Sequence, residues 1–124
     1  MDSGTLRIAT CQFAVGDSIS RNARAIQQFL KKAKKASAEI VHFSECALSG
    51  YVGADFPSFE EYDWAQLRDE TTRIMSLAAE LGLWVVLGSS HPLTEPHWPH
   101  NSLYLISPEG RIADRYDKRF CTPG

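Results

Sequence analysis

Hydrophobic and polar positions along the chain predict strands and helices in alternation. Residues 6–13 alternate with period two, and residues 39–43 form a short β-rich run. Residues 20–36 and 64–81 instead repeat apolar positions every three or four residues, as helices packed on one face do. These positions are Ala23, Ile26, Phe29, Leu30 and Ala33 in the first helix, and Trp64, Leu67, Ile74, Leu77, Ala78 and Leu81 in the second.

The residues around the two helices support these boundaries. Residues 16–18, Gly-Asp-Ser, offer a turn and an N-cap for the first helix. Gly82 stands where a left-handed residue ends the second. Residues 47–59 contain two glycines and a proline and predict a loop.

The last third of the chain predicts three more strands. Residues 84–88 are apolar on both parities, which is typical of a central strand covered on both faces. Prolines make 92–99 a loop, and the runs 102–107 and 111–116 flank a Pro-Glu-Gly turn and predict a hairpin. The order β-α-β-α-β-β-β predicts a layered α/β domain.

Length and charge narrow the possible functions. The 124 residues suit one domain. Thirteen Lys and Arg against fifteen Asp and Glu argue against a protein built to hold nucleic acid. No apolar run reaches the roughly 18–20 residues of a membrane span, and residues 1–5 lack a secretory signal pattern. Three cysteines without a C-x-x-C pair favour a reducing compartment, so we expect a cytoplasmic protein.

Two charged residues are candidates for catalysis. Glu45 follows a short strand and precedes a glycine-rich loop, and its apolar neighbours Phe43 and Leu48 predict a raised pKa suited to a general base. Lys118 follows an amphipathic strand and is able to stabilise an oxyanion. The alternative is that both are solvated charges at strand ends, as most Glu and Lys are.

The three cysteines are weaker candidates for a nucleophile. Cys46 follows Glu45, but adjacent side chains of an extended segment point to opposite faces. Cys11 lies inside the first predicted strand and is expected in the core. Cys121 lies three residues beyond Lys118, in a segment whose conformation the pattern does not predict.

Other polar clusters predict no cofactor. The histidine-rich loop suggests metal binding, but its prolines prevent the helix that would align two ligands, so an exposed polar loop is favoured. Its candidate ligands are His91, Glu95, His97 and His100. The basic run 31–35 suits a solvated helix face better than a nucleic-acid or membrane contact. The glycines form no phosphate-binding motif.

Taken in order, several segments resemble one family. Residues 7–13, 40–51, 83–88, 101–104 and 110–118 together resemble the N-terminal portion of the carbon–nitrogen hydrolases, the nitrilase superfamily. The most specific blocks are Glu-Cys-Ala-Leu-Ser-Gly-Tyr from position 45 and Arg-Tyr-Asp-Lys from position 115.

The resemblance implies a fold and a chemistry. The fold is an α-β-β-α sandwich, of which this chain would be the incomplete N-terminal part. The reaction is hydrolysis of a non-peptide C–N bond in an amide, a carbamoyl compound or a nitrile by a Glu-Lys-Cys triad, without metal or organic cofactor. By position, Glu45 would be the general base, Lys118 would stabilise the tetrahedral intermediate, and Tyr51 would help to shape the pocket wall.

The chain departs from the family pattern at two places. Ser44 stands where proline is common, and the nucleophilic cysteine of the family follows the lysine at a distance that residues 119–124 do not provide. We therefore expect residues 1–124 to be a partial domain that is inactive alone. An incomplete sandwich leaves apolar faces and sheet edges open, so we also expect marginal stability, a homo-oligomer or a complementing C-terminal segment.

Two other functions fit the same residues. The chain is either a truncated, non-catalytic interaction or regulatory form that pairs with a full-length hydrolase, or a generic α/β ligand-binding domain. In the second case Glu45 and Lys118 are unrelated surface charges. The hydrolase interpretation requires their side chains to converge.

Overall fold

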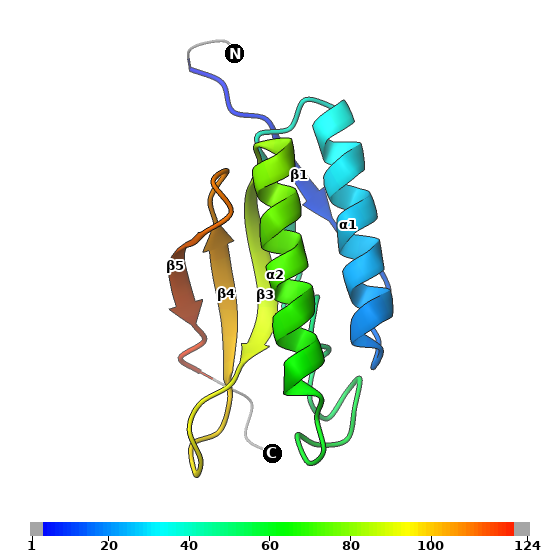
Figure 1. Ribbon diagram of the computed structural model, residues 1–124, viewed down its shortest axis with the longest axis vertical. Coiled ribbons are helices and arrows are strands. Elements are labelled where there is room, and N and C mark those ends of the chain that lie inside the picture. Colours follow the sequence, from blue (N-terminus) through cyan, green and yellow to red (C-terminus); the bar gives the residue numbers. More distant parts are fainter. Residues whose placement is uncertain (1–3, 121–124) are drawn as a thin grey trace.

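The structure is a computed structural model that describes residues 4–120 (Figure 1). Within that range the chain forms two helices and five strands, in the predicted order. The helix at 64–81 has the predicted bounds, whereas the strand that begins at 84 continues to His91. The elements are β1 (Ile8–Cys11), α1 (Ile19–Lys35), β2 (Ile40–Phe43), α2 (Trp64–Leu81), β3 (Trp84–His91), β4 (His100–Ile106) and β5 (Ile112–Asp117).

Side chains and a glycine set the helix ends. Ser18 Oγ accepts the N–H of Arg21 at 3.2 Å, and Asp63 Oδ1 accepts that of Gln66 at 3.0 Å. Helix α2 ends at Gly82, whose φ of 67° lies in the left-handed region that suits glycine. The N-cap predicted within residues 16–18 is Ser18, and the predicted end of α2 at Gly82 is confirmed.

The strands form one sheet in sequence order, β1-β2-β3-β4-β5. Strands β1, β2 and β3 are parallel, with Ile8 opposite Ile40 and Ile40 opposite Trp84. Strands β4 and β5 return antiparallel and form the predicted hairpin. Parallel neighbours need crossover connections, and α1 and α2 provide them.

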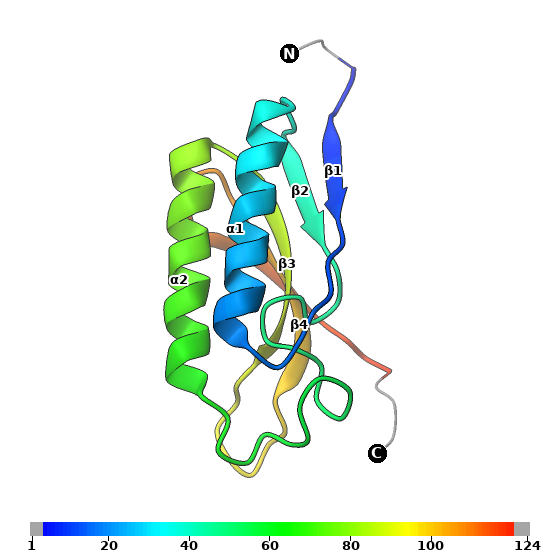
Figure 2. The ribbon, with the colours of Figure 1, turned by 90° about the vertical axis from the view of Figure 1, so that its right-hand side faces the viewer.

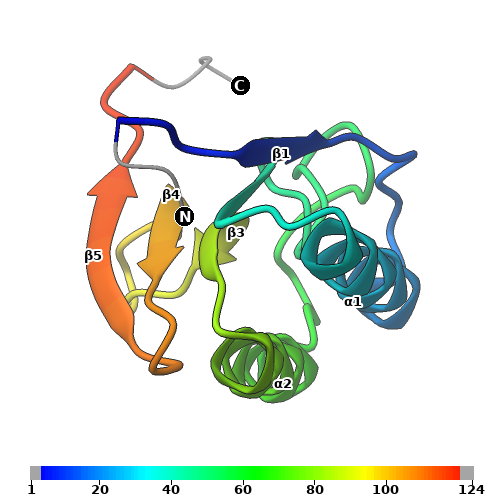
Figure 3. The ribbon, with the colours of Figure 1, turned by 90° about the horizontal axis from the view of Figure 1, so that it is seen from above.

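Both helices cover the same face of the sheet (Figures 2 and 3). Crossover connections between parallel strands share one handedness, and the strand order advances in a single direction from β1 to β3. Both helices therefore lie on the same side of the sheet. Alternate strand residues on this face are fully buried against the helices. The core includes Ile26, Leu30, Val41, Phe43, Ile74, Ala78, Val85 and Leu87. The lysines of the run 31–35 are exposed on the outer side of α1, as predicted.

The other face, which we call the open face, bears apolar side chains that neither helix covers. Trp84 and Val86 are half-buried there, whereas Val85 between them has no exposed surface. The prediction that 84–88 is covered on both faces is therefore wrong, because both crossovers fall on one side. The strand registers add further members to the open face: Ile8, Ile40, Leu103 and Leu105. One helix layer on one sheet is the N-terminal part of the predicted α-β-β-α sandwich.

No helix within residues 4–120 is long and apolar enough to cross a membrane.

Candidate active site

The turn that follows β2 crosses the open face directly over Gly88. A Cβ atom at that position of β3 would clash with the carbonyl oxygen of Ser44 and lie 2.7 Å from the amide nitrogen of Cys46. Only glycine lets two backbone segments approach this closely. Gly88 therefore determines where Glu45 lies, between those two residues.

Three hydrogen bonds fasten the turn to neighbouring elements. The buried Asn22 of α1 donates its side-chain N–H to the carbonyl of Leu48 at 3.1 Å. Ser49 Oγ accepts the N–H of Ser90 at 2.9 Å, and the hydroxyl of Tyr62 donates to the carbonyl of Ser49 at 2.8 Å. The turn is thus tied to the first helix, to β3 and to the loop before α2.

Glu45, Asn101 and Lys118 meet at one carboxylate oxygen. Oε1 of Glu45 accepts hydrogen bonds from Nζ of Lys118 and from Nδ2 of Asn101, both at 2.7 Å. The backbone N–H of Lys118 also donates to the carbonyl of Asn101 at 2.8 Å. Oε2 accepts no hydrogen bond from any residue between 4 and 120 and is the oxygen open to a reacting group. The structure brings the two charged candidates together.

The environment of Glu45 lowers its pKa. The hydrogen bond from Lys118 has the largest effect, desolvation opposes it, and the bond from Asn101 lowers the pKa further. The predicted upward shift is wrong, because Phe43 and Leu48 point into the core while the side chain of Glu45 stays 46% exposed. Glu45 is therefore a carboxylate at neutral pH, the form that accepts a proton.

Stability does not account for this arrangement. The side chain of Lys118 is 34% exposed, and a pair as accessible as this one contributes about 0–1 kcal/mol to folding. The chain nevertheless uses Gly88 and Asn101 to place the carboxylate. An ammonium beside a fixed carboxylate suits proton transfer and stabilisation of an oxyanion.

Asp117 fixes the strand end that precedes Lys118. Its Oδ1 accepts the hydroxyl of Ser102 at 2.6 Å and forms an ion pair with Nε of Arg115 at 3.0 Å. Its Oδ2 accepts a hydrogen bond from NH2 of Arg115 at 3.3 Å and lies 3.7 Å from Nε2 of His100. The bond from Ser102 is the main cause that lowers the pKa of Asp117. These contacts hold β5 in register with β4 up to the lysine.

The sequence interpretation did not single out Asn101 or Gly88. The sequence nevertheless contains a signal for each of these two residues. Asn101 is a polar residue at the start of an apolar strand, and a hairpin around 108–110 brings it opposite Lys118. A glycine inside an otherwise apolar strand is typical of a close backbone approach.

Neither described thiol is suited to attack a substrate held at this pair. Cys11 and Cys46 are both buried and unpaired. Burial raises the pKa of Cys11. Burial and the charge of Glu45 raise that of Cys46 to about 11. Both are therefore protonated at neutral pH, and the reactive form is the thiolate. Cys121 lies outside the described residues.

The predicted position of Cys46 relative to Glu45 is confirmed, for a different reason. Glu45 is exposed and Cys46 is buried, so the two side chains do not face each other. The segment is a turn rather than an extended strand, and Cys46 has a φ of 53°. The left-handed backbone at Cys46 turns its side chain inward.

Tyr51 lies in the loop after this turn. Its N–H donates to Oδ2 of Asp55 at 2.7 Å, and its carbonyl accepts the N–H of Asp55 at 2.8 Å. Its role in a pocket wall stays a prediction. The loop continues into a group of packed aromatic rings: Phe56, Phe59, Tyr62, Trp64 and Trp98.

The histidines considered as metal ligands have other surroundings. His91 bonds to a tyrosine and an arginine, and His100 pairs with an aspartate. His97 and Glu95 are exposed in the loop after β3. In the part of the chain that the structure describes, no three His, Cys, Asp or Glu residues are placed to hold a metal ion.

The chain belongs to the carbon–nitrogen hydrolase family, whose model matches residues 7–121. The predicted family is thereby confirmed. No curated protein matches the sequence.

Solved structures share the fold. The C. elegans NitFhit protein superimposes with a TM-score of 0.81 over 93% of this chain, at 21% identity. A double mutant of the amidase from Nesterenkonia sp. in complex with acrylamide has a TM-score of 0.82 over 99% of this chain, at 21% identity. A mutant of that amidase with the acetamide moiety of fluoroacetamide covalently added at the active-site cysteine has a TM-score of 0.80 over 95%, also at 21% identity.

This chain spans less than half of each of these proteins. It covers 28% of the NitFhit chain and 47% and 45% of the two amidase chains. At this level of identity the likeness establishes the fold.

Proposed function

We propose that this region supplies the general base and the oxyanion-stabilising cation of a hydrolase that acts on a non-peptide C–N bond. The observation that supports the proposal is the 2.7 Å contact between Oε1 of Glu45 and Nζ of Lys118 in a carbon–nitrogen hydrolase chain. Amides are the favoured substrates, because the Nesterenkonia amidase binds acrylamide on the same fold. Carbamoyl compounds and nitriles are the remaining substrate classes.

The proposed reaction uses each group at a stated atom. Oε2 of Glu45 takes the proton of a cysteine thiol as sulfur bonds to the substrate carbon, and the ammonium of Lys118 stabilises the negative charge on the substrate oxygen. Glu45 then gives the proton to the departing nitrogen, which leaves as ammonia or an amine, and a thioester remains. Glu45 next takes a proton from water, whose oxygen attacks the thioester carbon. The carbon–sulfur bond then breaks, the acid is released, and Glu45 gives the proton to the departing sulfur, which restores the thiol and the carboxylate.

The thiol in this proposal is neither Cys11 nor Cys46, because both are buried and protonated at neutral pH. We therefore expect the 124-residue chain alone to be inactive. Triad members act as a unit, so the base and the cation without their nucleophile give almost no turnover. Activity of the isolated chain that disappears in Cys121→Ala would instead identify Cys121 as the nucleophile.

The experiment measures ammonia release from acrylamide by an extended chain that contains these residues and a nucleophilic cysteine. Glu45→Gln and Lys118→Ala should each reduce kcat/KM by at least about 100-fold. Glu60→Gln and Lys31→Ala, which remove exposed charges elsewhere, are the matched controls and should retain activity. Full activity in either site variant would refute the assigned roles.

The apolar side chains of the open face support a second candidate function, in assembly with another protein chain. These side chains suit a second sheet, supplied by a complementing C-terminal segment or by another copy. A non-catalytic form that pairs with a full-length hydrolase through this face is the alternative function. Co-expression with the full-length enzyme tests it: mixed oligomers with altered turnover support pairing, and failure to co-purify argues against it.

A further inference from the structure

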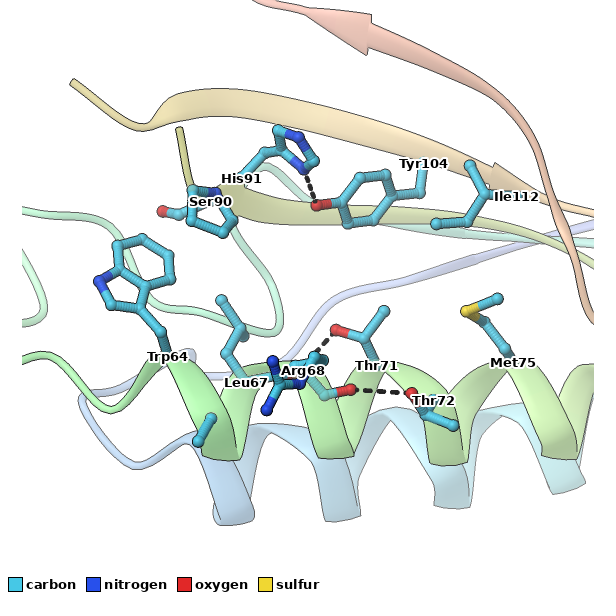
Figure 4. Close-up of a pocket in the computed structure, with 12 residues that line it drawn as sticks. Trp64, Leu67, Arg68, Thr71, Thr72, Met75, Ser90, His91, Tyr104 and Ile112 are labelled. Carbon is cyan, nitrogen blue, oxygen red and sulfur yellow. Dashed lines mark hydrogen bonds between the residues drawn. The ribbon is translucent and has the colours of Figure 1, made fainter. Parts of the chain in front are cut away.

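A pocket of about 390 Å³ lies between α2 and the sheet, on the helix-covered face (Figure 4). Its apolar walls include Trp64, Leu67 and Met75 from α2 and Ile112 from β5. Cavities of this size and composition are typical of small-molecule sites. The pocket is separate from Asn101 and Lys118, because its β4 residue, Tyr104, belongs to the helix-covered face.

The floor of the pocket presents an oriented hydrogen-bond donor. NH1 of Arg115 lies 2.6 Å from Nε2 of His91, and Nδ1 of His91 lies 2.7 Å from the hydroxyl of Tyr104. Arginine only donates, so Nε2 accepts, Nδ1 carries the proton and the oxygen of Tyr104 accepts it. Burial and the charge of Arg115 both lower the pKa of His91, in agreement with a neutral ring. The O–H of Tyr104 is thus left to donate, and no described residue accepts it.

The charge around the pocket favours an anion. Arg68 lines it and forms no ion pair with any residue in the described range 4–120. None of the residues that line the pocket is acidic. The hydroxyls of Thr71 and Thr72 donate to carbonyls of their own helix (Figure 4). Ser90 Oγ is bonded to Ser49 Oγ, so the O–H of Tyr104 is the polar hydrogen left for a ligand inside the pocket. The exposed guanidinium of Arg68 lies beside α2, where it adds positive charge at the edge of the pocket (Figure 4).

We propose that this pocket binds a small carboxylate with an aromatic or branched apolar body. The apolar body packs between Trp64 and Met75, the carboxylate accepts the O–H of Tyr104, and the guanidinium of Arg68 lies near its charge. A neutral analogue of the same shape loses both polar contacts. The site is independent of the proposed hydrolysis.

The test titrates the ¹⁵N-labelled chain with 3-phenylpropanoate and, as the matched neutral probe, 3-phenylpropan-1-ol. The carboxylate should give saturable shifts at the indole N–H of Trp64 and at the amides of α2, with a Kd at least about tenfold below that of the alcohol. Tyr104→Phe, which keeps the ring, should raise the Kd about tenfold, and Arg68→Gln about threefold. Arg24→Gln on the exposed side of α1 is the control and should leave the Kd unchanged.

Three results would overturn the proposal. They are the absence of saturable shifts up to about 10 mM carboxylate, equal affinity for the alcohol, and shifts that cluster around Glu45 and Lys118 instead of Trp64. Arg68→Gln alters an exposed side chain, so it reports on binding even if Tyr104→Phe destabilises the fold. Because no substrate is turned over, failure here is distinguishable from failure of the proposed hydrolase function.

Discussion

The ammonium of Lys118 lies 2.7 Å from the carboxylate of Glu45, although 73 positions separate them in the chain. Neither residue is deeply buried, and each stands just beyond the end of a strand. Their meeting therefore depends on the sheet, in which β2 and β5 are separated by two strands. The two charges are therefore partners across the sheet and do not lie on separate sides of the molecule.

Removal of Lys118 should raise the pKa of Glu45. The lysine hydrogen bond is the largest cause of the lowered value, so Lys118→Met should bring the pKa back toward the ordinary value of 4.5. The carboxyl ¹³C shift of Glu45, followed against pH, measures this. A midpoint unchanged by the substitution would show that the pair does not form in solution.

The same pair gives a signed pH dependence of stability. Because the folded-state pKa of Glu45 is lowered, its contribution is fully present above the ordinary value of 4.5 and is lost as the pH falls through the lowered value. Urea unfolding of wild type and Glu45→Gln at pH 7 and pH 3 should therefore show a larger difference at pH 7. The difference should be at most about 1 kcal/mol, as expected of an exposed pair.

Asn101 should act as a positioning residue for Glu45. Asn101→Leu removes one donor and should raise the pKa of Glu45 by less than Lys118→Met does, because the lysine bond has the larger effect. Asn101→Asp adds a negative charge beside the carboxylate and should raise the pKa further. In an active full-length enzyme, the acidic limb of the kcat/KM profile should move to higher pH in the same order. A purely structural role would lower activity without moving that limb.

A side chain at position 88 should displace the turn that bears Glu45. Gly88→Ala puts a Cβ into the backbone of Ser44 and Cys46 and should cost about 1–3 kcal/mol in unfolding free energy. Gly16→Ala is the matched control, since a Cβ there meets nothing within 4 Å and the substitution should change stability by less than about 1 kcal/mol. Chemical denaturation of both variants gives the comparison, and equal stability would contradict the close approach.

The two described cysteines should resist alkylation. Iodoacetamide at pH 8 should modify neither Cys11 nor Cys46 in the folded chain, and both in urea, because burial keeps them protonated and covered. Peptide mass mapping distinguishes them from Cys121. Rapid labelling of Cys46 in the folded state would show that its thiol is accessible beside Glu45.

The open face should mediate self-association of the isolated chain. Ile8→Lys introduces a charge at a side chain that is already 55% exposed, so it should shift the chain toward monomer without harming the core. Gln28→Lys adds the same charge on the exposed surface of α1 and should leave the distribution of oligomers unchanged. Sedimentation velocity measures the distribution. A monodisperse wild-type monomer that melts cooperatively would argue against an incomplete sandwich.

Local patterns predicted most of the fold and part of the site. The caps at Ser18 and Gly82 and the periodicity of 64–81 are local properties, so the structure matches them closely. The burial of Trp84 and Val86 was mispredicted because it depends on which face of the sheet the two crossover helices cover. The pKa shift of Glu45 had the wrong sign because sequence neighbours indicated burial, whereas the dominant partner comes from a distant strand.

The hairpin around 108–110 also limits where insertions and deletions of residues are compatible with the site. Beyond the irregularity next to the bend, side chains alternate between faces from Asp114 to Asp117, so a one-residue shift in the β4–β5 register would send Lys118 to the opposite side of the sheet. The loop 92–99 joins β3 and β4 without setting the pairing of Asn101 with Lys118. Insertions and deletions among functional relatives should therefore accumulate in the proline-rich connection and be nearly absent from the β4–β5 bend.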